Sequence, residues 1–132
     1  MKMVQVTDEL AHDHYETIGT MRSRHGDEIF KVTTDYMKSW PVLAMVREGV
    51  ESIAIVRKMT WATEPKSAAP GTIRWDYSHL SYGYVDGNKS RLLNIVHASA
   101  DADEAAPEIA LWFNDDELFD HEITDKLYKR WH

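Results

Sequence analysis

Asn94-Ile95-Val96-His97-Ala98-Ser99 places a histidine at the end of a short apolar run, and the other predicted elements are arranged around it. Short apolar runs bounded by polar residues are typical of buried strands. We therefore expect a strand over residues 92–97 that carries His97 to an edge of a sheet. Downstream, Glu108-Ile109-Ala110-Leu111-Trp112-Phe113 belongs to a predicted helix over residues 101–112 that returns a carboxylate towards the imidazole.

Strands and helices alternate along the chain, which indicates an α/β or α+β sandwich. Further strands are predicted over 1–6 and 41–46, where apolar residues alternate or run together. Residues 22–27 contain Gly26 and should interrupt a helix there. Residues 60–74 should form an ordered loop. Residues 77–91 should form a surface insertion with a hairpin at Asp86-Gly87. Pro107 should make the helix over 101–112 start late or irregularly. The other predicted helices cover 8–21 with Thr7 as N-cap, 28–38, 50–59, the short turn 115–118, and 123–131.

Composition sets the class of protein. The 132 residues are 43% hydrophobic, which suits one domain with a core of moderate size. No apolar run reaches the roughly 18 residues of a transmembrane helix, and the cysteine-free chain can form neither disulfides nor thiolate metal sites. We expect a cytoplasmic location. The net charge of −7 argues against broad electrostatic binding of nucleic acid.

A histidine, an acidic neighbour and a hydroxyl make His97 a candidate nucleophile towards phosphorus. With an ordinary pKa near 6.5, most imidazole is neutral at pH 7. Glu108 can accept a hydrogen bond from one ring nitrogen of His97. That bond would orient the ring so that the other nitrogen faces a substrate. Ser99 can bond the same carboxylate or a phosphate oxygen. The alternatives are a structural histidine at a strand end, a solvated Glu108 and a helix-capping Ser99.

Two arginines are the candidates for holding phosphate, because guanidinium binds phosphate in a bidentate manner. Arg74 follows the rigid turn Ala69-Pro70-Gly71. Arg57 lies on the helix predicted over 50–59. Thr63 can donate to a phosphate, and Tyr15 can contact a substrate. Each residue also has a purely structural alternative. Either arginine could form a surface ion pair, the Thr63 hydroxyl could stabilise a turn, and the Tyr15 ring could pack against its neighbours.

The segment His12-Asp13-His14 has the residue types of a metal motif. Residues two apart on a helix point to different sides, so we expect all three to lie on a solvated helix face. No metal-ligand set is predicted within the chain.

These residues, in this order, resemble the nucleoside diphosphate kinase family, most closely over Tyr36–Gly49, Thr63–Asp76 and Asn94–Phe113. The resemblance implies a ferredoxin-like sandwich, an antiparallel sheet covered by helices, formed by 1–132 as a single domain. It implies transfer of the γ-phosphoryl of a nucleoside triphosphate to a nucleoside diphosphate through phosphohistidine. It also implies Mg²⁺ held mainly by the nucleotide phosphates, and a homo-oligomer, either a hexamer or a tetramer.

The family's site residues fall on positions of this sequence. Its nucleophile falls on His97, its orienting glutamate on Glu108 and its serine on Ser99. The nucleotide-binding positions fall on Tyr15, Arg57, Thr63, Arg74 and Asn94, of which Asn94 contacts the ribose.

The sequence departs from the family pattern at its N-terminus. The family opens with a strand that bears a Lys-Pro-Asp-Gly segment, followed by a helix, and the first residues here match the family's second strand. We therefore expect a domain that is incomplete at its N-terminus. An absent central strand would leave unpaired backbone groups and reduce activity.

Three tryptophans, Trp40, Trp61 and Trp75, stand where the family favours glycine. Glycine positions often require a positive φ or a close backbone approach, so tryptophan should be costly there. One hypothesis is that UGA codons, read as glycine in the source lineage, are translated here as tryptophan. Genuine replacement by aromatic residues is the alternative.

Two other functions remain open. A catalytically impaired nucleotide-binding or interaction module would have the same fold but lack phosphohistidine. A nucleic-acid-associated protein would bind DNA in a salt-dependent way, which the charge of −7 disfavours.

Overall fold

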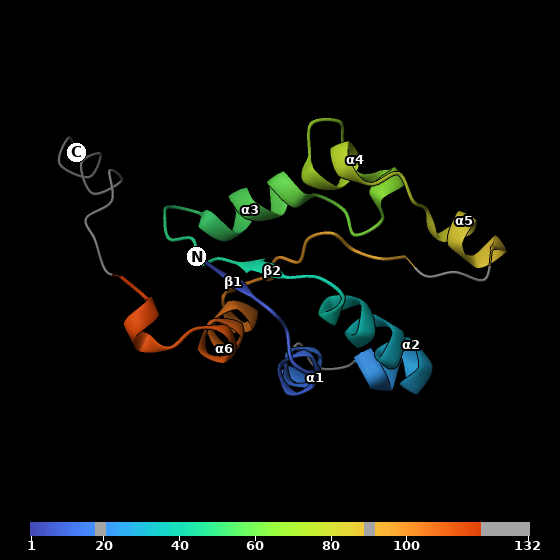
Figure 1. The fold of residues 1–132 in the computed structure, drawn as a ribbon. Helices are drawn as coiled ribbons and strands as arrows, with labels where there is room; N and C mark the ends of the chain where they lie inside the picture. Colours follow the sequence, from blue (N-terminus) through green and yellow to red (C-terminus); the bar gives the residue numbers. More distant parts are fainter. Residues whose placement is uncertain (18–20, 89–91, 120–132) are drawn as a thin grey trace. The chain divides into compact units, whose positions relative to one another are not determined.

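The computed structural model describes residues 1–17, 21–88 and 92–119 (Figure 1). The chain forms two compact units, one of residues Met1–Ser52 with Asp101–His132, the other of Ile53–Ala100. Each unit is described by itself. The helix predicted over 123–131 lies outside the described residues. No helix in the described part of the chain is both long and apolar enough to cross a bilayer.

The first unit holds a small antiparallel sheet. Strand β1 (Lys2–Val4) pairs with β2 (Val42–Ala44), and Met3 lies opposite Leu43. Both strands were predicted, although each is shorter than its apolar run. Met3 is 64% exposed and Leu43 49%, so one face of this two-stranded ribbon presents apolar side chains to solvent.

Four helical segments belong to the same unit. They are α1 (Asp8–Thr17), α2 (Met21–Lys38), α6 (Ala102–Trp112) and the 3-10 turn η2 (Asp115–Glu117). Helix α1 packs against both α2 and α6. Among the described residues of this unit, the buried apolar side chains are those of Val6, Ala11, Phe30 and Phe113.

Local sequence signals account for where these helices begin and bend. The hydroxyl of Thr7 accepts a hydrogen bond from the Leu10 amide at 3.1 Å, which confirms the predicted cap. The predicted break falls at Gly26, whose φ of 82° is left-handed and interrupts α2. The expected irregular start of α6 is wrong. Asp101 caps the helix by accepting from the Glu104 amide at 2.9 Å, and α6 continues through Pro107.

The second unit contains short helices joined by loops. They are α3, which starts at the unit boundary (Ser52–Thr60), η1 (Pro65–Ser67), α4 (Ile73–Tyr77) and α5 (Tyr82–Gly87). The helix over 50–59 is thus confirmed. The hairpin at Asp86-Gly87 is wrong, because these residues end α5. The hydroxyl of Ser81 caps that helix by accepting from the Tyr84 amide at 3.2 Å.

The strand predicted over 92–97 is also wrong. Within the described residues the only sheet is β1–β2, and Ile95 is 44% exposed. A strand requires a ladder partner for its backbone groups. Here arginine side chains instead donate to the Val96 carbonyl, within this run, and to the Ala98 carbonyl, just after it.

Candidate active site

His97 lies on an extended segment between two carbonyls that accept hydrogen bonds from arginines. Nη2 of Arg74 donates to the Val96 carbonyl at 2.8 Å, and Nη1 of Arg57 donates to the Ala98 carbonyl at 3.0 Å. The imidazole itself is exposed. Three residues predicted from different parts of the sequence therefore meet at one peptide segment. The arrangement concentrates positive charge around an accessible histidine.

Arg74 is the most constrained of these side chains, with only 4% of its surface exposed. Its Nη1 donates to the carbonyls of Trp61 at 2.6 Å and Ala62 at 3.3 Å. The pKa of Arg74 lies below its ordinary value, chiefly because burial disfavours the charged form, and also because Arg57 is close. Carbonyl dipoles offset part of that cost. The guanidinium thus ties the segment around His97 to the end of α3.

Thr63, Asn94 and Ser99 belong to the same unit as these arginines. Thr63 and Asn94 are exposed, and Ser99 is half-buried. The loop after Thr63 is anchored by Glu64, whose carboxylate accepts from the Ser67 hydroxyl and from the Tyr82 amide. These bonds, led by that of Ser67, hold the pKa of Glu64 below its ordinary value. The predicted ordered loop over 60–74 is therefore confirmed, with η1 and the start of α4 inside it.

The first unit holds the other two predicted residues, Tyr15 on α1 and Glu108 on α6. Burial, followed by the neighbouring Tyr36, raises the pKa of Tyr15 to about 12. The Tyr15 ring lies edge-on to Phe30, with centroids 6.3 Å apart, as expected of a packing tyrosine. Glu108 is 6% exposed, which is rare for a carboxylate and rules out the solvated reading.

One buried polar residue escaped the sequence reasoning. His12 and Asp13 are exposed as expected, but His14 is only 2% exposed, so the prediction of a solvated face is wrong for it. Its position was detectable, because it lies three residues after Ala11, the most buried residue of α1. Residues three and four apart share one helix face.

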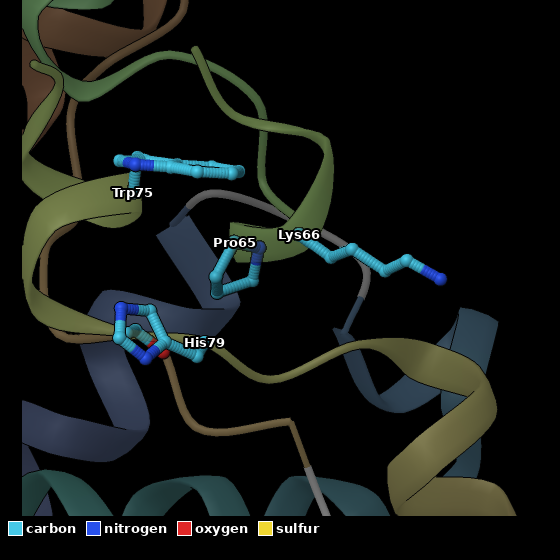
Figure 2. Close-up of a pocket in the computed structure, with 5 residues that line it drawn as sticks. Pro65, Lys66, Trp75 and His79 are labelled. Atoms are coloured by element: carbon cyan, nitrogen blue, oxygen red, sulfur yellow. The ribbon is translucent and has the colours of Figure 1, made fainter. Parts of the chain in front are cut away.

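A pocket of about 320 Å³ lies beside the loop in the second unit. Its lining residues are Pro65, Lys66, Trp75, Ser78 and His79. In Figure 2 the Trp75 and His79 rings lie on either side of Pro65, and the Lys66 side chain extends away from both rings. The pocket includes none of the predicted site residues.

Only one of the three unusual tryptophans has a backbone suited to glycine. Trp61 has a φ of 60°, in the left-handed region that bulky residues avoid. Trp75 lies inside α4. Among the described residues other than glycine, positive φ angles occur at Glu51 and Trp61, so Trp75 does not have one. Trp40 projects into solvent, 73% exposed.

Comparison with known proteins places the whole arrangement in one family. A family model described as nucleoside diphosphate kinase matches residues 1–118. The nucleoside diphosphate kinase of Borreliella burgdorferi is 39% identical over 125 residues, which are 95% of this chain and 74% of the relative. That of Pyrococcus furiosus is 40% identical over 130 residues, 98% of this chain and 73% of the relative.

Solved structures agree. A transition state mimic of nucleoside-diphosphate kinase from Borrelia burgdorferi, with bound vanadate and ADP, matches with a TM-score of 0.81 at 39% identity, covering 96% of this chain and 75% of that one. A halophilic nucleoside diphosphate kinase from Halobacterium salinarum, in complex with CDP, matches with a TM-score of 0.70 at 36% identity, covering 96% and 74%. The predicted ferredoxin-like α/β fold is thereby confirmed.

Proposed function

The chain belongs to the nucleoside diphosphate kinase family, which makes it a phosphotransferase, and we propose that it works through phosphohistidine at His97. In this proposal the γ-phosphoryl of a nucleoside triphosphate passes to His97 and then to a nucleoside diphosphate. The observation that carries it is the pair of guanidinium groups bonded to the carbonyls on either side of an exposed His97. Such an arrangement suits an anionic phosphate chain.

The first half-reaction forms one bond and breaks one. The unprotonated nitrogen of His97 attacks the γ-phosphorus, and the bond to the leaving diphosphate breaks with its electron pair on the bridging oxygen. The other ring nitrogen keeps its proton and donates a hydrogen bond to Glu108. The carboxylate thereby stabilises the positive charge that develops on the ring. A second diphosphate reverses these steps and regenerates the free imidazole.

The remaining predicted residues hold the nucleotide. Arg57 and Arg74 neutralise charge on the transferring group, and the exposed hydroxyl of Thr63 donates to a phosphate oxygen. Asn94 contacts the ribose, Tyr15 contacts the substrate, and Ser99 supports the carboxylate or the phosphate. The relative from Borrelia burgdorferi that binds vanadate and ADP supports a ligand of this class.

Magnesium enters this proposal with the nucleotide. The guanidinium N–H groups that bond the carbonyls beside His97 cannot ligate a cation. The phosphate oxygens are thus the groups that would hold Mg²⁺, and the ion would neutralise their charge.

We also propose how the protein is organised and where it acts. Both units belong to one nucleoside diphosphate kinase-like domain over 1–132, which assembles as a homo-oligomer, a hexamer or a tetramer. Its partners are nucleoside tri- and diphosphates rather than nucleic acid or membranes, and it works in the cytoplasm. The matching of residues 1–118 by one family model supports the single domain.

Labelling with γ-³²P-ATP tests the proposal. We expect the protein to acquire a label that acid removes and base does not, and to pass it to added nucleoside diphosphate. His97→Ala should abolish the label and lower turnover by at least about 10³-fold, because the nucleophile is lost. His79→Ala, which removes another exposed histidine of the same unit, should keep both.

Two other outcomes would favour the alternatives. Nucleotide binding without any label, in a protein that is folded, would indicate the impaired binding module. Tight DNA binding that weakens steeply with salt would indicate a nucleic-acid-associated protein.

A further inference from the structure

We propose that His14 is a positioning residue for Glu108, held by Trp112 in the one tautomer that presents an N–H to the carboxylate. The three residues lie in the first unit, on α1 and α6. The inference rests on the proposed function in one respect, that Glu108 orients His97. The tautomer of His14 depends only on its neighbours in the folded protein, and it can be measured without any assay of activity.

Trp112 fixes which ring nitrogen of His14 carries hydrogen. The indole Nε1–H of Trp112 lies 3.2 Å from Nδ1 of His14. An indole nitrogen only donates, so Nδ1 must offer a lone pair. A hydrogen on Nδ1 would point at the indole hydrogen and break the bond. The imidazole is therefore neutral, with its single hydrogen on Nε2.

Packing holds the two rings in this arrangement. The His14 and Trp112 rings meet edge to face, with centroids 5.5 Å apart and planes at 84°. The Tyr15 ring packs on His14 in the same manner, at 5.1 Å and 65°. With 2% of His14 exposed, water cannot easily replace the indole as its partner. The tautomer is thus set by a neighbour that cannot titrate.

Helix geometry brings the same imidazole to Glu108. Residues 108 and 112 are one turn apart on α6, so both lie on the face that packs against α1. A nitrogen of His14 and a carboxylate oxygen of Glu108 lie within 4.8 Å of one another. With Nδ1 bonded to Trp112, Nε2–H is the group available to this carboxylate.

A neutral donor suits the role proposed for Glu108. A carboxylate that is 6% exposed requires hydrogen-bond donors in place of water. A cationic partner would supply them but would also neutralise the charge that the reacting ring needs. Neutral His14 satisfies one carboxylate oxygen and leaves the negative charge in place. Outer partners of this kind fix the orientation of the group that does the chemistry.

The test combines ¹⁵N NMR of the histidine rings with single-turnover labelling. In the unaltered protein we expect His14 as the neutral Nε2–H tautomer. Trp112→Phe keeps an aromatic ring but removes the N–H, so Nδ1 can take up a second proton and a cationic fraction of His14 should appear. The rate of phosphohistidine formation at saturating ATP should fall about tenfold with the KM for ATP unchanged.

Substitutions of His14 itself complete the test. His14→Phe fills the space without a donor and should slow the same step by about 10–100-fold. His14→Gln, which offers both an acceptor and a donor, should recover most of the rate. His12→Gln alters an exposed histidine of the same helix and should change nothing. Thermal unfolding of each variant identifies any loss of rate that comes from misfolding.

Two results would overturn the inference. One is an Nδ1–H or cationic His14 in the unaltered protein, and the other is an unchanged rate in folded His14→Phe. If the unaltered protein acquires no label at all, the proposed function fails instead. The NMR measurement then still decides the tautomer of His14.

Discussion

Trp61 combines a bulky side chain with a left-handed backbone, at φ 60°. This conformation costs a residue with a Cβ roughly 1–2 kcal/mol. It persists because the Trp61 carbonyl accepts the shortest of the hydrogen bonds from Arg74, at 2.6 Å, and its amide bonds the Arg57 carbonyl at 2.7 Å. The backbone here is thus determined by its partners rather than by the residue that occupies it.

Pairs of substitutions at two tryptophans separate backbone strain from side-chain packing. At position 61 we expect Trp61→Gly to be more stable than Trp61→Ala by about 1 kcal/mol, because only glycine adopts positive φ freely. At position 75, inside α4, the order should reverse by about 1 kcal/mol. Urea unfolding of the four variants gives the free energies. A Trp61→Ala variant at least as stable as Trp61→Gly would show that residue 61 carries no strain.

The two arginines should differ in their contribution to stability. Arg74→Met leaves several carbonyls of a buried site without a donor, and should cost at least about 3 kcal/mol. Arg57→Met removes the single bond to Ala98 from a half-buried side chain, and should cost about 1 kcal/mol. Denaturant midpoints measure both. Equal losses would contradict a special structural role for Arg74.

At the scale of elements, capping residues could be read from the sequence and strand pairing could not. Thr7 acts within three residues, so its signal was local and the start of α1 was predictable. The run at 92–97 has the composition of a strand, but a strand exists only where another segment supplies a ladder. Instead, Arg57 and Arg74, which are far away in sequence, donate hydrogen bonds to the carbonyls of Ala98 and Val96. The hairpin predicted at Asp86-Gly87 is wrong because Ser81 caps the helix α5, and this cap outweighs the turn signal.

One ion pair links β1 to η2 and should make stability depend on pH. Lys2 Nζ donates to both oxygens of Glu117, at 2.8 and 2.6 Å, and holds the pKa of this carboxyl below its ordinary value of 4.5. The native state thus binds this proton less readily than the unfolded chain. The stabilisation is present above the ordinary pKa and is lost as pH falls through the lowered value.

Glu117→Gln tests this link. Its free energy of unfolding should lie below that of the unaltered protein at pH 6, and the difference should vanish in acid. Asp116→Asn changes the net charge equally without touching the ion pair, and is the matched control. Denaturant unfolding between pH 2 and 7 provides the comparison. A difference that persists at low pH would mean that Glu117 acts by packing alone.

At the scale of the whole molecule, the fold class could be predicted from the sequence, but contacts between distant residues could not. Residue type made His97, Arg57 and Arg74 candidates, the family resemblance favoured them, and the structure brings them to one segment. His14 was missed because a histidine between two polar neighbours reads as surface, and only its spacing from Ala11 indicates otherwise. Its partner Trp112 is 98 residues away, a separation that local patterns cannot bridge.

The unequal burial of the two guanidiniums governs how each can respond to an anion. A guanidinium has five N–H donors, and among the described residues Arg57 commits one of them, to Ala98. Arg57 can therefore donate hydrogen bonds to a phosphate while it keeps its bond to the Ala98 carbonyl. Arg74 is only 4% exposed and already donates to the carbonyls of Trp61, Ala62 and Val96, so an anion has less access to it. A ligand that draws Nη2 of Arg74 away from the Val96 carbonyl would therefore loosen the peptide that carries His97.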